Sequence, residues 1–288
     1  MTLLMIEFLA APFAASLILT GIHAYLGVHV VERGVIFVDL SLAQIAALGA
    51  TVALLLPPSQ GDPHAPFVYW VSLGFTFIGA AIFSMVRGRN SRIPQEAIIG
   101  ITYAVASAAS ILAMSKSTAQ AEHLKDMLVG NILAVSWGEV GKTAALYGAI
   151  GLFHYRFRRT FLLISTDPAG AQARGLSIPL WDFLFYASFG FVVTSSVAVA
   201  GVLLVFCYLI VPAVAAMLYA DRIGPRLAIG WTMGTIVSAL GIYLSVILDL
   251  PTGATIVCTF GLTLTLMALA RPLVVRRRAA AAVGVGGA

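Results

Sequence analysis

The chain has 288 residues, of which 60% are hydrophobic and only 10% are charged, with a formal net charge of +5. Apolar runs of about 20 residues recur along it, and a helix of that length spans the hydrocarbon core of a bilayer. The composition therefore predicts an all-α polytopic membrane protein without a soluble domain. The basic residues lie in short loops and in the tail, where arginines set membrane topology, which argues against a nucleic-acid partner.

Nine apolar segments are candidate membrane spans. They cover residues 8–30, 35–56, 67–86, 96–114, 140–155, 183–200, 201–219, 227–248 and 252–270. Gly201 and Pro212 interrupt the 183–219 stretch and no polar loop divides it, so it is either two spans or one span with a re-entrant piece, giving nine or eight spans. We expect the transmembrane domain to occupy residues 1–275 and residues 276–288 to form a disordered cytoplasmic tail.

Arginines gather on one side of these spans. If the spans alternate in direction, one face carries Arg33, the cluster from Arg87 to Arg92, Arg156 with its neighbours, Arg222 with Arg226, and the tail from Arg271. Loops rich in arginine stay in the cytoplasm because moving these charges across a bilayer is costly. This face is therefore predicted to be cytoplasmic.

A polar interruption, TDPAGAQARGLSIPLWD, lies between apolar runs at residues 166–182 on the predicted cytoplasmic face. Asp167 suits the N-cap of a short helix, residues 169–174 favour helix, and Gly175 suits its C-terminal end ahead of Pro179. The pattern predicts a docking helix within about residues 166–178 for a cytoplasmic protein, or else an ordinary amphipathic loop. The candidate docking residues are Asp167, Ala171, Arg174 and Gly175.

Polar residues are few within the spans, and charge at bilayer depth is costly enough to suggest a function. Tyr25, His29 and Arg33 recur every four residues and so form one line on a helix face. This line is either a polar seam along a transport path or a set of hydrogen bonds to neighbouring helices near the cytoplasmic end. His23 lies on another face, where a packing role is favoured over metal binding.

The second span begins with FVDLSLAQIAALG and places Asp39, Ser41 and Gln44 in an otherwise apolar helix. Asp39 is the best intramembrane site candidate, with Ser41 and Gln44 beside it. The alternative is that Asp39 is a first-turn carboxylate, stabilised by the positive end of the helix dipole and by Arg33.

The tripeptide Gly141-Lys142-Thr143 matches the end of a phosphate-binding loop, but the motif needs an earlier glycine where Ser136 stands, and a preceding strand. We therefore expect no ATP hydrolysis by this chain. Cys207 and Cys258 lie in apolar runs without metal-site or disulfide spacing, so we expect no cofactor in this chain.

Four segments together resemble the permeases of the ABC-3 family, which import zinc, manganese or iron. They are EAIIGITYAVASAASIL, DMLVGNILAVSWGEV, the docking segment, and GVLLVFCYLIVPAVAAML. The resemblance extends over nearly the whole chain and implies a type II ABC importer-like permease in the bacterial inner membrane. It further implies a homodimer, a cytoplasmic ABC ATPase that binds ATP and Mg²⁺, and an extracytoplasmic metal-binding protein. By this resemblance, residues 167–175 match the coupling helix that enters a cleft of the ATPase.

The chain departs from the family pattern in the second span, where members commonly carry Asp followed four residues later by His. Aligned on Ala47 to Gly49, these positions hold Leu40 and Gln44, and Asp39 is displaced by one residue. Asp39 and Gln44 are five residues apart, roughly 140° around a helix, so they do not form a two-residue chelate. Gln is a poor zinc ligand, whereas oxygen donors suit manganese.

These observations leave three functional hypotheses. The first is an ATP-driven importer of a divalent metal, in which Asp39 lines or gates the path with Ser41, Gln44, His29 or Tyr25. The second is an importer of a metal chelate, whose ligand brings its own donors. The third is a stand-alone secondary transporter, although the chain shows neither paired membrane carboxylates nor an inverted repeat. The loop residues Asp62, His64, Glu122, His123 and Asp126 are either a surface that meets a binding protein or solvated surface.

Overall fold

The computed structural model describes residues 3–59, 65–87, 94–115 and 132–285. Within these ranges the regular structure is helical and no strand forms. The long helices are α1 (Leu3–Glu32), α2 (Val38–Leu54), α3 (Pro66–Arg87), α4 (Gln95–Met114), α6 (Trp137–Arg156), α9 (Ile178–Ala200), α10 (Val202–Met217), α11 (Ile223–Ile247) and α12 (Thr252–Val285). The short helices are η1 (Pro57–Ser59), η2 (Ile132–Ala134), α7 (Arg158–Thr166) and α8 (Pro168–Ala173).

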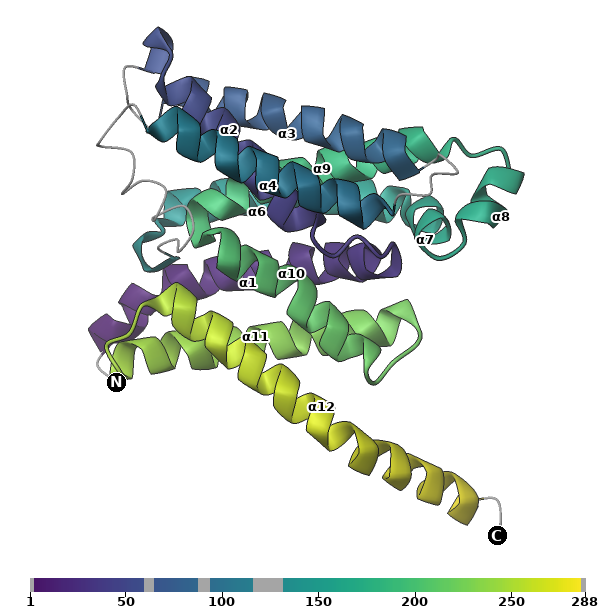
Figure 1. Ribbon diagram of the computed structural model, residues 1–288. Coiled ribbons are helices and arrows are strands. Elements are labelled where there is room, and N and C mark those ends of the chain that lie inside the picture. Colours follow the sequence, from purple (N-terminus) through teal and green to yellow (C-terminus); the bar gives the residue numbers. More distant parts are fainter. Residues whose placement is uncertain (1–2, 60–64, 88–93, 116–131, 286–288) are drawn as a thin grey trace.

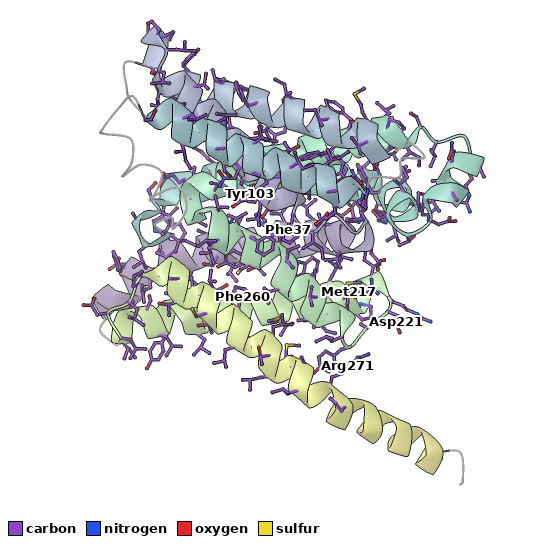
Figure 2. The ribbon with its side chains drawn as sticks, in the orientation of Figure 1. Phe37, Tyr103, Met217, Asp221, Phe260 and Arg271 are labelled. Carbon is purple, nitrogen blue, oxygen red and sulfur yellow. The ribbon has the colours of Figure 1, made fainter. Side chains whose placement is uncertain are left out.

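The long helices cross the molecule from one end to the other (Figure 1). Helices α7 and α8 lie at the right-hand end of this view, and the N-terminus lies at the opposite end. Helix α2 packs against α3, α4 and α9, and helix α1 packs against α10, α11 and α6. Arg271 and Asp221 also lie toward the right-hand side (Figure 2), so this end is the arginine-rich face that the sequence predicts to be cytoplasmic.

The helices account for the predicted spans. Among the described residues, six helices are long and apolar enough to cross a membrane, namely α1, α3, α4, α9, α11 and α12. Helices α2 and α10 are shorter apolar helices, and α6 adds a further helix of 20 residues. Gly201, at φ 76°, separates α9 from α10, while Pro212 lies inside α10 without ending it. The 183–219 stretch therefore forms two helices.

Helix α12 extends further along the chain than the span predicted from the sequence. Helix α12 continues to Val285, past the domain boundary expected at residue 275, so this structure gives the segment 276–285 a helical backbone. The boundary of the transmembrane domain stays a prediction. The loop residues Asp62, His64, Glu122, His123 and Asp126 lie outside the described residues.

Close helix packing depends on glycine where α1 meets α10. A Cβ atom added at Gly27 would clash with the carbonyl oxygen of Leu209, so the two backbones are in direct contact there. A Cβ added at Gly21, on the same helix, would meet nothing within 4 Å. Small residues allow this approach in membranes, where packing replaces the hydrophobic driving force between helices.

We predict that Gly27→Ala destabilises the protein, because α1 and α10 must separate to admit the methyl group, at a cost of about 1–3 kcal/mol. Gly21→Ala is the matched control and should be neutral or slightly stabilising, since alanine favours helix over glycine. Thermal unfolding of both purified variants in the same detergent measures the difference. Equal melting temperatures for the two variants would contradict the tight α1–α10 contact.

Candidate functional site

Helix α8 forms where the sequence predicts the docking helix. Asp167 caps it, its Oδ1 accepting a hydrogen bond of 2.8 Å from the backbone N–H of Gly170. At the other end Gly175 adopts φ 77°, which glycine tolerates, and the N–H of Leu176 donates to the carbonyl oxygen of Ala171 at 3.2 Å. The helix is thus fixed at both ends by its own sequence.

One side of α8 packs against the neighbouring helices α7 and α9. Ala171 is fully buried and packs in a cluster with Ile164 of α7 and Ile178 of α9. Ala169, Gln172, Ala173 and Arg174 are exposed on the other side. Of the predicted docking residues, Ala171 therefore faces inward and holds the helix in place, whereas Arg174 and Gly175 remain accessible. The sequence did not distinguish these two sides, because the segment is too short for a clear periodicity.

Arg33 anchors both segments that flank α8. Its Nη1 donates to Asp182 Oδ1 of α9 at 2.7 Å, and both side chains are fully buried. Its Nε donates to Ser165 Oγ of α7 at 2.9 Å, and its guanidinium carbon lies 3.9 Å from the centre of the Phe185 ring. The residue that neutralises Arg33 is thus Asp182, and no contact with Asp39 is found among the described residues.

Tyr25 and His29 bond to neighbouring helices beside this pair. His29 Nδ1 lies 2.9 Å from Ser165 Oγ, which also donates to the carbonyl oxygen of Phe161 at 2.8 Å. With the bond from Arg33, the one donor and two acceptor positions of the Ser165 hydroxyl are all used. Tyr25 Oη makes a longer contact of 3.4 Å with His154 Nδ1 of α6. This arrangement matches the alternative in which the line of polar residues on α1 bonds neighbouring helices.

His154 was not selected from the sequence. It is buried, its Nε2 lies 2.8 Å from Ser188 Oγ of α9, and its ring stacks on Phe161 with centroids 4.4 Å apart. It therefore connects α6, α7 and α9 at the same level as His29. The available signal was a histidine near the end of an apolar run, but only the packing of the helices shows which residues it meets.

Asp39, Ser41 and Gln44 lie elsewhere, on the buried helix α2. Asp39 is 1% exposed, and both its Oδ1 and Ser41 Oγ are buried without a hydrogen-bond partner in the described part of the chain. Gln44 is also buried. The five predicted path residues therefore form two groups, one on α2 and one on α1.

Asp39 lies deep among the helices although it is in the first turn of α2. Its side chain is buried, and helix α2 packs against α3, α4 and α9 and also contacts α10. Phe37, just ahead of α2, lies near the middle of the helices in Figure 2. The carboxylate is thus buried among the helices, and its role as an intramembrane site stays a prediction.

The described residues contain no group of three or more His, Cys, Asp or Glu side chains that could hold a metal ion.

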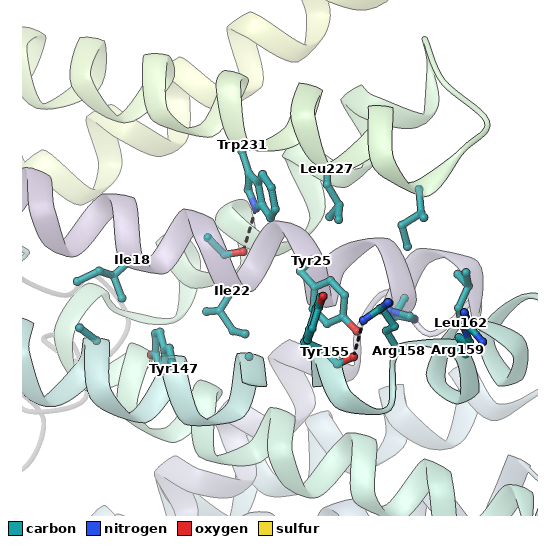
Figure 3. Close-up of a pocket in the computed structure, with 16 residues that line it drawn as sticks. Ile18, Ile22, Tyr25, Tyr147, Tyr155, Arg158, Arg159, Leu162, Leu227 and Trp231 are labelled. Carbon is teal, nitrogen blue, oxygen red and sulfur yellow. Dashed lines mark hydrogen bonds between the residues drawn. The ribbon is translucent and has the colours of Figure 1, made fainter. Parts of the chain in front are cut away.

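A groove of about 810 Å³ lies between α1, α6, α7 and α11. Tyr25 and His29 line it, whereas Asp39, Ser41 and Gln44 do not. Figure 3 shows Trp231 reaching across it to α1, where its Nε1 donates to the carbonyl oxygen of Gly21 at 3.0 Å. Arg158 and Arg159 lie at the end of the groove near Leu162, away from Ile18.

Sequence comparison identifies the family of this helical protein. The profile of the ABC 3 transport family matches residues 5–271. The chain belongs to the ABC 3 transport family. The fold class predicted from the sequence, an all-α polytopic permease of the ABC-importer kind, is confirmed, and the chain is a multi-pass inner-membrane protein.

Relatives in this family are metal transport proteins. The chain is 28% identical over 275 residues to the manganese transport system membrane protein MntC of Halalkalibacterium halodurans, covering 93% of this chain and 88% of that protein. It is 27% identical over 254 residues to a probable iron transport system membrane protein of Haemophilus influenzae, covering 88% and 90%. The solved structure of PsaBC from Streptococcus pneumoniae in complex with Fab matches with a TM-score of 0.74 and 23% identity, covering 91% of each chain. This last similarity shows the fold.

We predict that Arg33→Leu lowers the free energy of unfolding by about 3 kcal/mol or more, because it leaves the buried carboxylate of Asp182 without its counter-charge. The double variant Arg33→Gln/Asp182→Asn, which removes both charges, should lose less. Arg226→Leu is the control, since its ion pair with Glu32 is partly exposed and worth about 1 kcal/mol or less.

Thermal unfolding in detergent measures this series. A double variant that is less stable than Arg33→Leu would show that the two residues stabilise the protein by something other than the attraction between their charges.

Proposed function

We propose that the chain is the membrane-spanning permease of an ATP-driven ABC importer of divalent transition metal ions, namely zinc, manganese or iron. In this proposal two copies pair as a homodimer, a cytoplasmic ABC ATPase binds ATP and Mg²⁺, and an extracytoplasmic protein delivers the metal. The observation that carries the proposal is helix α8, a capped helix at the arginine-rich end with a seated inner side and an exposed outer side of small residues. The metal relatives support the cargo class.

The outer side of α8 is suited to a protein cleft. Ala169 and Ala173 present only methyl groups, so a partner surface can approach the helix closely, and Arg174 adds a charge for pairing at the rim. Asp167 and Gly175 fix the two ends of the helix. ATP binding and hydrolysis in the partner would move α8, and the buried contacts of Ala171 would carry that movement to α7 and α9.

Asp39 is the proposed path or gate residue. Its carboxylate is buried and without a hydrogen-bond partner for Oδ1 among the described residues, so a passing cation would offer it the countercharge that Arg33 gives to Asp182. Ser41 and Gln44 point away from Asp39 around the same helix, so they would not share one ion with it but would line other parts of the path with neutral oxygen donors, which suit manganese better than zinc. Tyr25 and His29 would act through their contacts with α6 and α7.

A metal chelate is the second candidate cargo. The observation that favours it is the helix α2 sequence, in which Leu40 and Gln44 occupy the positions where family members commonly carry Asp and His. A cargo that brings its own donors needs fewer from the path. A stand-alone transporter would have no use for the accessible, capped helix α8.

We predict that Ala173→Trp abolishes ATP-driven metal uptake, because the indole prevents close approach of the ATPase to the outer side of α8. Uptake of zinc, manganese and iron is measured in vesicles that contain the chain, the candidate ATPase and the binding protein. Leu269→Trp, on the exposed face of α12, is the control for a bulky surface substitution and should transport normally. If Ala173→Trp transports as well as Leu269→Trp, α8 is not the docking helix.

In the same vesicles, we predict that Asp39→Asn lowers metal uptake about tenfold, equivalent to about 1.4 kcal/mol, while the ATPase still binds. Asp39→Glu keeps the charge and should retain part of the transport. Unchanged uptake in Asp39→Asn would remove Asp39 from the path. Uptake of ferric citrate, with no uptake of any free cation by the native complex, would make the chelate the cargo.

A further inference from the structure

The groove between α1, α6, α7 and α11 has the depth of one membrane leaflet. On α1 its lining extends from Ile18 to His29, and on α6 from Ala144 to Tyr155. Each segment advances eleven residues, which corresponds to about 16 Å of helix. Half of a hydrocarbon core about 30 Å thick is about 15 Å. The groove therefore matches the acyl region of the leaflet on the side of α7.

The groove is lined mainly by apolar atoms, and glycines leave free space along it. Gly148 and Gly151 of α6 and Gly21 of α1 line it, and a Cβ atom added at any of them would meet nothing within 4 Å. The absence of side chains at these glycines is what hollows the surface. No acidic residue is among the described residues that line the groove.

The cytoplasmic end of the groove is basic and aromatic. Arg158 and Arg159 are exposed there, and Tyr155 is 64% exposed. The Arg158 guanidinium lies over the Tyr155 ring at 4.3 Å and donates to the Tyr155 carbonyl oxygen. Arg159 makes no hydrogen bond or ion pair within the described part of the chain. Arginine and tyrosine are typical of the level at which lipid headgroups lie.

We propose that this groove binds an anionic phospholipid of the cytoplasmic leaflet, with its acyl chains along α1 and α6 and its phosphate at Arg158 and Arg159. Basic pockets between transmembrane helices on the cytoplasmic side bind anionic headgroups by the same combination. The proposal is independent of the transported cargo.

Charge favours this occupant over a bare divalent cation, which the two arginines would repel and which would find no carboxylate among the described lining residues. A helix of a second copy is the other alternative, and the oligomeric state measured in the test distinguishes it from a lipid. A phospholipid has the required shape, since flexible chains fill an irregular apolar space and one charged end remains at the mouth.

The test is native mass spectrometry of the full chain, released from nanodiscs that contain equal amounts of phosphatidylglycerol and phosphatidylcholine. The native chain should retain phosphatidylglycerol preferentially. The double variant Arg158→Gln/Arg159→Gln should lose this preference on the order of 10- to 30-fold, because it removes both positive charges that attract the anionic headgroup. Each of the two charges contributes a similar free energy of lipid binding. Arg271→Gln, another exposed arginine outside the groove, is the matched control and should behave as the native chain.

Gly148→Leu tests the apolar part independently, because a Cβ atom at this position meets nothing within 4 Å and the leucine side chain would extend into the groove. It should reduce retention of both lipids while the melting temperature is kept. Retention that is unchanged in both the double arginine variant and Gly148→Leu overturns the proposal. The same spectra report the oligomeric state, so conversion of dimer to monomer by Gly148→Leu with unchanged lipid retention would assign the groove to a second copy and also overturn it.

Discussion

The buried ion pair between Arg33 and Asp182 is the constraint on which the arginine-rich half of this molecule depends. A charge placed in an apolar helix layer is stable only with a partner and well-formed hydrogen bonds, because desolvation of each ion costs several kcal/mol. Arg33 meets this requirement with Asp182 of α9 and Ser165 of α7, and it lies against the Phe185 ring. The end of α1 is thereby fixed to the two segments that flank α8.

This arrangement gives α8 a rigid base. Ser165 is two residues before the N-cap Asp167, and Ala171 is buried with Ile164 and Ile178. A force on the outer side of α8 therefore acts on α7 and α9 together, and through Arg33 on α1. The hydrogen bond from His29 to Ser165 continues the same connection along α1. Packed elements of this kind move as units, which is what transmission between a docking helix and a membrane path requires.

Local sequence patterns predicted the local features of the structure. Apolar length gave the spans, and the capping preferences of Asp167 and Gly175 gave α8, because these depend on residues near one another in the chain. The pairing of Arg33 with Asp182 joins residues 149 positions apart, and the bonds of His154 depend on how α6, α7 and α9 pack. Nothing in local periodicity specifies such a register, and one of the two alternatives drawn from the sequence paired Arg33 with the nearby Asp39 instead.

The position of Asp39 bears on the role of its carboxylate. A first-turn carboxylate at the membrane surface would be stabilised by water, by the helix dipole and by the nearest arginine. Arg33 is paired with Asp182, and Asp39 is buried with no hydrogen-bond partner for its Oδ1 among the described residues. In the path that we propose, a carboxylate without a fixed counter-ion among the described residues would bind an entering cation, whereas a fixed salt bridge would block that use. The proposal thus assigns Asp182 to the stability of the structure and Asp39 to transport.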